Sequence, residues 1–175
     1  MPRALTKDGM YNRAVHYLER YAASVEGVRV VLQRSVMRAQ RRGDVVPEAV
    51  HEWIEAALQK LVEGKLLDDA LFAETKVRSL RRSGASAQKV RQKLAVKGVS
   101  AQLVNTALES EDVEDDLQAA IIFARKKRLG PYTSRGSRTD LRDKQIASLA
   151  RAGFSLTIAR RVVDATDEAA LELVD

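Results

Sequence analysis

The chain has 175 residues and a formal net charge of +6, with a pI near 9.7. It contains no cysteine, which excludes disulfides, a thiolate nucleophile and Cys-ligated zinc or iron–sulfur sites. No window approaches the run of apolar residues that a membrane span requires, and the N-terminus lacks the apolar core of a secretion signal. We therefore expect a soluble, cytoplasmic protein, and its many Ala, Leu, Arg, Glu and Val residues favour helices.

Apolar residues recur at helical spacing in three segments of the first 66 residues. The predicted stripes are Ala14, Val15, Leu18 and Tyr21; then Val28, Val31, Leu32, Ser35 and Val36; then Val50, Trp53, Ile54, Ala57, Leu58 and Leu61. We expect Gly43 to follow the end of the second helix, Pro47 to lie in the first turn of the third, and Gly64 to stop it. Residues 1–66 are thus predicted to form an elongated first three-helix repeat.

The same three-helix pattern returns at 67–110 and at 111–175. In the second repeat, Asp68 or Asp69 is placed to cap a helix that turns Leu71, Phe72 and Val77 inward. Further helices are predicted to begin at three serines, namely Ser86, Ser100 and Ser155. The third repeat contains an elongated loop near 130–138, whose glycines, serines and proline predict a surface connection that is mobile.

Two short sequence overlays connect the repeats. Aligning "VKGVSAQLVNTAL" with "RAGFSLTIARRVV" places Gly98 on Gly153, and aligning "SVEGVRVVL" with "SAQKVRQKL" places Ser24 on Ser86. Because units of this kind contact mainly their neighbours, an array of them is extended. We predict an all-α fold, an elongated and curved tandem array of three three-helix repeats.

Positive charge is concentrated in blocks without acids. From Thr75 to Ser100 the cations are Lys76, Arg78, Arg81, Arg82, Lys89, Arg91, Lys93 and Lys97. Helical spacing places Arg78, Arg81 and Arg82 on one side of their helix, and Lys89, Lys93 and Lys97 along the next, whereas Arg91 points elsewhere. These residues are solvated helix faces or a surface for a polyanion, and none is arranged to read bases. Secondary basic patches are Arg34, Arg38, Arg41 and Arg42, and Arg125, Lys126, Lys127 and Arg128; the last four could equally serve solubility.

Three segments carry a resemblance to a known family. "GKLLDDALFAETKVRS", "SAQKVRQKLAVKGVSAQLVNTAL" and "LARAGFSLTIARRVV" resemble the RecX family of bacterial regulatory proteins. The resemblance implies binding to the RecA filament on DNA. We expect a monomer that also contacts single- and double-stranded DNA without sequence preference. The resemblance also implies negative modulation of filament assembly, ATPase and recombination, hence a part in DNA repair and the SOS response, with no catalysis, cofactor or membrane association. The acid-free block would then face DNA phosphates and acidic side chains of the filament.

Other functions have weaker support in the sequence. A helix-turn-helix transcription regulator is the main alternative, with Gln102 and Asn105 as possible base readers. An enzyme is disfavoured, because no nucleophile–base pair, nucleotide loop or metal constellation is present. We interpret Asp68 and Asp69 as capping residues rather than Mg²⁺ ligands, and Trp53 as a core residue. The two histidines, His16 and His51, do not predict a metal site.

Overall fold

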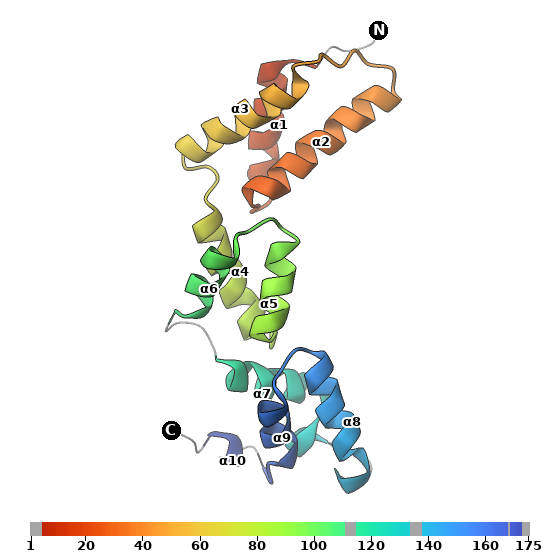
Figure 1. Ribbon diagram of the computed structural model, residues 1–175, viewed down its shortest axis with the longest axis vertical. Coiled ribbons are helices and arrows are strands. Elements are labelled where there is room, and N and C mark those ends of the chain that lie inside the picture. Colours follow the sequence, from red (N-terminus) through yellow and green to blue (C-terminus); the bar gives the residue numbers. More distant parts are fainter. Residues whose placement is uncertain (1–4, 111–114, 134–137, 168, 173–175) are drawn as a thin grey trace. The chain divides into compact units, whose positions relative to one another are not determined.

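The structure is a computed structural model that describes residues 5–110, 115–133, 138–167 and 169–172. Every element in these residues is helical, so the predicted all-α class is confirmed (Figure 1). The elements are α1 (Lys7–Leu18), α2 (Val25–Arg41), α3 (Val50–Glu63), α4 (Asp69–Arg82), α5 (Ala87–Ala95), α6 (Ala101–Leu108), α7 (Asp116–Lys127), the 3₁₀ helix η1 (Gly130–Tyr132), α8 (Arg138–Arg151), α9 (Leu156–Asp164) and α10 (Ala169–Glu172).

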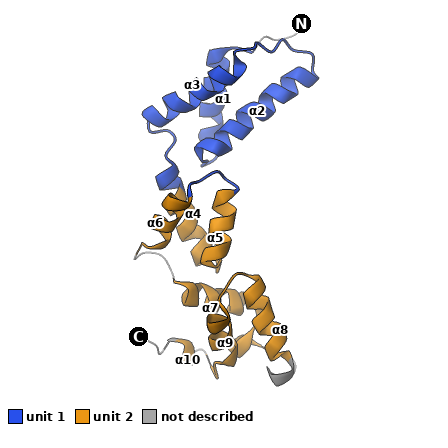
Figure 2. Ribbon diagram, in the orientation of Figure 1, with its two compact units in different colours: residues 1–72, 96–100 blue, residues 73–95, 101–175 orange. Residues whose placement is uncertain are grey.

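The chain divides into two compact units (Figure 2). The first contains residues 1–72 and 96–100, and the second contains 73–95 and 101–175, so the division falls inside α4. The helices succeed one another as expected, with α1–α3, α4–α6 and α7–α9 in the three predicted repeats. The repeat boundaries and the curved, elongated shape stay predictions.

The first unit has its core among α1, α2 and α3. Its fully buried members are Met10, Ala14, Val28, Leu32, Val36, Val50, Ile54, Leu58, Leu61 and Leu67. The stripe predicted for the second helix is confirmed except at Val31, which is only partly buried, and the stripe of the third helix is confirmed, with Trp53 packed against this core while remaining partly exposed. Tyr21 is wrong as a core residue: α1 ends at Leu18, and the Tyr21 side chain, beyond the helix, is 53% exposed.

Two helix ends in the first unit differ from the prediction. Pro47 is not in the first turn of α3 but three residues ahead of it, where its carbonyl accepts a hydrogen bond from the amide of Val50 at 3.1 Å. Gly64 ends α3 as expected, yet the left-handed conformation belongs to the next residue, Lys65, with φ 54°. Gly43 follows α2 with φ 77°, as its predicted role requires.

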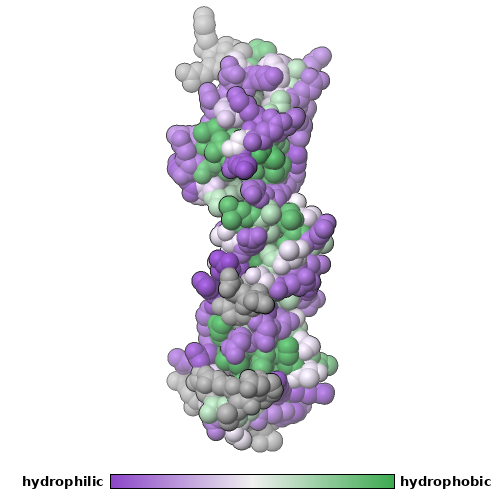
Figure 3. All heavy atoms as spheres, turned by 90° about the vertical axis from the view of Figure 1, so that its left-hand side faces the viewer, coloured by the Kyte–Doolittle hydropathy of each residue, from purple (hydrophilic) through white to green (hydrophobic). Residues whose placement is uncertain are grey.

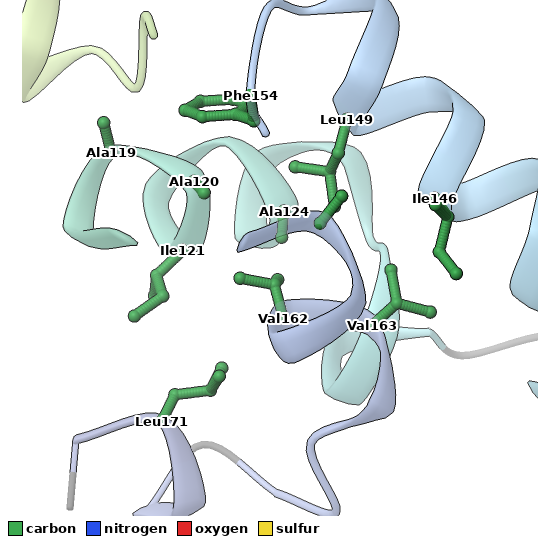
Figure 4. Close-up of a cluster of buried hydrophobic side chains, with 11 residues drawn as sticks. Ala119, Ala120, Ile121, Ala124, Ile146, Leu149, Phe154, Val162, Val163 and Leu171 are labelled. Carbon is green, nitrogen blue, oxygen red and sulfur yellow. The ribbon is translucent and has the colours of Figure 1, made fainter. Parts of the chain in front are cut away.

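The second unit has a hydrophobic core among α7, α8, α9 and α10, to which α7 contributes three alanines (Figure 4). Ala119, Ala120 and Ala124 are fully buried, and they leave room for Val162 of α9 and Leu149 of α8 to pack closely. The remaining buried members are Ile121, Ile146, Phe154, Ala159, Val163 and Leu171.

The predicted surface loop near 130–138 is wrong for its first residues. Gly130–Tyr132 form η1, and Gly130 is buried, with its amide donating to Oε1 of Gln145 at 2.6 Å. Gly130 has φ 58°, and a Cβ there would lie 2.5 Å from the carbonyl oxygen of Val162. Glycine is therefore present because the chain passes against the α9 backbone, rather than for mobility. Residues 134–137 lie outside the described residues.

The start of α4 is capped as predicted, but one inward residue is wrong. Oδ1 of Asp68 accepts hydrogen bonds from the amides of Ala70 and Leu71 at 2.9 and 3.0 Å. Phe72 and Val77 are buried, whereas Leu71 is 61% exposed. Successive helical residues are rotated by about 100°, so Leu71 lies on the opposite side of α4 from Ala73, which is fully buried.

In the fold, each serine that the overlays matched bonds the residue directly before a matched glycine. In the first unit, Ser24 caps α2 by accepting from Gly27, and its hydroxyl donates to the carbonyl of Lys97 at 2.5 Å. In the second unit, Ser86 accepts from Lys89 at the start of α5, and its hydroxyl donates to the carbonyl of Ala152 at 2.6 Å. Each accepting carbonyl directly precedes a matched glycine, Gly98 or Gly153, with φ 72° or 92°. The serine cap on α9, Ser155, is also confirmed, because it accepts from Ile158.

An aspartate completes each of these two contacts. The amide of Val25 donates to Oδ1 of Asp69 at 2.9 Å, and the amide of Ala87 donates to Oδ1 of Asp116 at 2.9 Å. Each of these aspartates follows one that caps its own helix, Asp68 or Asp115. We call each set of serine, second aspartate and glycine turn a Ser–Asp–Gly junction. In both Asp–Asp pairs, the first residue begins a helix and the second caps a helix earlier in the chain.

Candidate functional site

The cations of α4 divide into exposed and buried members. Arg78 and Arg82, one turn apart, are exposed, as predicted for a binding surface. Arg81 is only 2% exposed; its Nη1 forms a salt bridge with Oδ1 of Asp116 and a hydrogen bond with the carbonyl of Ala85 at 3.0 Å. The prediction that Arg81 contacts DNA or a filament is therefore wrong.

A signal in the sequence could have placed Arg81 inside. Ala73, Val77 and Arg81 follow one another at intervals of four residues, and the first two are fully buried. A residue at that spacing continues the inward stripe of its helix. The charge suggested the surface, but a guanidinium can be buried where a carboxylate and a carbonyl accept its hydrogen bonds.

The cations of α5 also differ in their surroundings. Lys89 and Lys93 are exposed and one turn apart on the helix, as predicted. Lys97 is exposed but is wrongly placed on that helix, because α5 ends at Ala95 and Lys97 lies in the following turn, within the first unit. Nε of Arg91 donates to Oδ1 of Asn105 at 2.9 Å, so this pair joins α5 to α6. Asn105, considered above as a base reader, is engaged inside the protein.

The predicted patch in the first unit lies at the end of α2. Arg34, Arg38, Arg41 and Arg42 are all exposed. Arg42 pairs with the carboxylate of Asp44 at 2.7 Å, which offsets its charge. Arg34 and Arg38 are one turn apart, so their exposed side chains share a face of the helix.

The third basic patch, residues 125–128, lies at the C-terminal end of α7. Arg125, Lys126, Lys127 and Arg128 are exposed. Nζ of Lys126 donates to the carbonyl of Ser83 at 2.8 Å, and the guanidinium of Arg125 lies 5.6 Å from the centre of the Tyr132 ring. Arg128 adopts φ 56° as it ends the helix. At least two of these cations therefore have structural contacts, and the patch is not a uniform binding surface.

The remaining candidates give no sign of chemistry. Among the described residues, no group of three or more His, Cys, Asp and Glu side chains could hold a metal ion. Asp68 and Asp69 are capping residues, as interpreted from the sequence. No helix in the described part of the chain is long and apolar enough to cross a membrane. On the face seen in Figure 3, hydrophobic patches are bordered by hydrophilic residues.

Comparisons with known proteins identify relatives over most of the chain. Residues 68–108 match the family model described as "RecX, second three-helix domain". A regulatory protein RecX from Myxococcus xanthus is 44% identical, over 93% of this chain and 88% of the relative. Another, from Agrobacterium fabrum, is 37% identical over 82% of this chain and 77% of the relative.

Solved structures agree with the fold. A crystal structure of regulatory protein RecX has a TM-score of 0.67 at 23% identity, covering 91% of this chain and 72% of that one. RecX from Lactobacillus salivarius has a TM-score of 0.67 at 20% identity, covering 96% and 97%. The all-helical fold thus recurs in these structures, and the sequence identity to the Myxococcus and Agrobacterium proteins shows the family. The chain belongs to the RecX family of regulatory proteins.

Proposed function

We propose that this chain binds the filament that RecA forms on DNA and negatively modulates its assembly, ATPase and recombination activity. It would do so in the cytoplasm as a monomer, by binding alone, without catalysis or a cofactor. The observation that carries the proposal is the acid-free block at 75–100 in a chain of the RecX family, because much of its charge is exposed. Sequence-independent contacts with single- or double-stranded DNA suit such a surface.

Four cations support this surface best: Arg78 and Arg82 of α4, and Lys89 and Lys93 of α5, all exposed and all in the second unit. If each neutralises one phosphate, log K falls with log salt at a slope of about −3 to −4. Raising salt from 50 to 200 mM then weakens binding roughly 100-fold. Arg81 is buried and is not counted, so the four exposed cations set the upper limit of the salt slope that this surface supplies.

The test is the ATPase rate of the cognate RecA on single-stranded DNA, titrated with this protein well below one copy per recombinase. Inhibition at low ratios is expected, since a modulator of filament growth or integrity affects many subunits per molecule bound. The double variant Lys89→Glu with Lys93→Glu should inhibit much less, with unchanged circular dichroism, because exposed charges contribute little to stability.

A matched control is available on α9, where Arg160 and Arg161 are exposed. Arg160→Glu with Arg161→Glu makes the same change in net charge outside the proposed surface, and should inhibit nearly as well as the natural sequence. Absence of inhibition by the natural sequence, together with tight binding to one duplex sequence, would reject the proposal in favour of a transcription regulator. Equal loss in both double variants would reject the proposed surface.

A further inference from the structure

The first unit contains a groove between α1 and α2 that none of the sequence patterns predicted. It has a volume of about 470 Å³, within the usual range for ligand sites. Its polar and aromatic lining consists of Asn12, Arg13, His16, Tyr17 and Arg20 from the α1 segment and Arg38 from α2. Asn12, Arg13, His16 and Tyr17 recur at helical spacing and share one face of α1, and Arg20 follows in the turn after the helix ends.

The lining is strongly cationic. It contains three arginines, each exposed to solvent, and none of the described residues that line the groove is acidic. In the described part of the chain, neither Arg13 nor Arg38 forms an ion pair. Beside the groove, Glu19 pairs with Nδ1 of His16 at 2.8 Å, and the Glu19 side chain remains 59% exposed. A concave surface with this charge attracts anions and favours planar, doubly hydrogen-bonded recognition of phosphate.

One of the groove residues, Tyr17, belongs to a pair of tyrosines. The rings of Tyr17 and Tyr21 are 5.1 Å apart between centroids and tilted by 36°. Tyr17 lines the groove, Tyr21 is 53% exposed, and the guanidinium of Arg20 lies 5.9 Å from the Tyr21 ring centre. The combination of an exposed aromatic ring with arginines is typical of sites where bases stack while the phosphate backbone follows a positively charged groove.

We propose that this groove binds single-stranded nucleic acid. Arg13, Arg20 and Arg38 would hold successive phosphates, and Tyr21, backed by Tyr17, would stack on a base. A duplex does not fit this chemistry, because its base faces are already stacked within the helix and only its phosphates could be engaged. An acidic peptide could use the arginines but would leave the tyrosine pair without a planar partner. No base-specific hydrogen bonding is implied, so the site should accept many sequences.

The proposal is tested by fluorescence anisotropy with a labelled 20-residue oligothymidylate and the full chain, with no RecA present. Tyr21→Ala should weaken binding about 5- to 150-fold, the range found for removing one stacked base, whereas Tyr21→Phe keeps the ring and should change it less than about twofold. Arg13→Ala with Arg38→Ala should weaken binding and reduce the magnitude of the salt slope by about 1.4, because each phosphate contact on a single strand contributes about 0.7. Arg151→Ala with Arg160→Ala, exposed cations of the second unit, is the matched control and should change binding far less.

A second measurement locates the contact on the unmodified chain. Oligothymidylate carrying 5-iodouracil, cross-linked by ultraviolet light and mapped by mass spectrometry, should attach to the peptide that contains Tyr17 and Tyr21. Full affinity of Tyr21→Ala, or cross-links found only elsewhere, would overturn the proposal. Equal competition by a polyglutamate peptide would overturn it in favour of an acidic protein segment. Because the assay omits RecA, its result is independent of ATPase inhibition, and either proposal can fail alone.

Discussion

Replacing Asp116 tests how far the second unit depends on its buried ion pair. Its carboxylate binds the guanidinium of Arg81, whose side chain is 3% exposed, and also accepts from the amide of Ala87. Removing one partner of a buried pair costs about 3–5 kcal/mol, because it leaves the other charge in a poorly solvated site. The Asp116 side chain is 33% exposed, so water offsets part of this, and about 2–3 kcal/mol is the better expectation.

The lost cap on α5 adds about 1 kcal/mol, so Asp116→Ala should lower the free energy of unfolding by about 3–4 kcal/mol. Asp116→Asn keeps an oxygen for the amide of Ala87 and loses only the charge, so its effect should be smaller by about 1 kcal/mol. Urea unfolding followed by circular dichroism measures both. The effect should persist at high salt, because buried pairs are poorly screened.

Asp143→Ala is the matched control, because Asp143 approaches Arg142 at 3.5 Å but is 96% exposed. It should change the free energy of unfolding by less than about 0.5 kcal/mol. Trp53, the one tryptophan, lies in the first unit, so its fluorescence follows that unit separately. A change below about 1 kcal/mol for Asp116→Ala would refute the assignment of Arg81 to a buried structural pair.

Two further predictions concern a glycine and a surface ion pair. Gly130→Ala should lower the free energy of unfolding by about 2–4 kcal/mol, since the new Cβ would meet the Val162 carbonyl. Gly43 is also left-handed but has nothing within 4 Å of such a Cβ, so Gly43→Ala should cost only about 1 kcal/mol. Equal losses in urea unfolding would contradict the close contact at Gly130. Hydrogen bonds from Arg29 lower the pKa of Glu55 from its ordinary value of 4.5, so the pair stabilises the fold above that pH and the benefit is lost as pH falls through the lowered pKa. The Glu55 side chain is 58% exposed, so Glu55→Gln should lower the free energy of unfolding at pH 7 by less than about 1 kcal/mol. The difference between the variant and the natural sequence should shrink in acid, and a difference that grows there would contradict the predicted sign.

The helices and many of their caps could be predicted because their causes are local. Apolar spacing identified the buried face of α2, and the match of Ser24 with Ser86 identified two residues with the same role. The partners of those serines could not be predicted, because Lys97 and Ala152 lie 73 and 66 residues away. Repeated short motifs thus marked equivalent positions but did not show what each position contacts.

The candidate surface was less predictable, because charge alone does not determine exposure. Arg81 shares its helix with the exposed Arg78 and Arg82, and only its spacing from Val77 distinguishes it. The error for Tyr21 is the reverse: its spacing predicts a buried residue, but it is exposed, because α1 ends before it. In both cases exposure depends on which part of a helix packs against another segment, and only the tertiary structure shows this.

The Ser–Asp–Gly junctions determine the order in which a newly made chain can complete its helices. Val25 and Asp69 are 44 residues apart, so at about 5–20 residues per second Asp69 is synthesised roughly 2–9 s after the first residue of the helix that it caps. Likewise, Asp116 is made 29 residues after Ala87, and Ala152 is made 66 residues after Ser86. Each middle helix is therefore finished by residues made later, and its first turn stays incomplete on the ribosome until they emerge. A nascent chain halted before Asp116 would hold α5 without its aspartate and the guanidinium of Arg81 without the carboxylate that pairs with it.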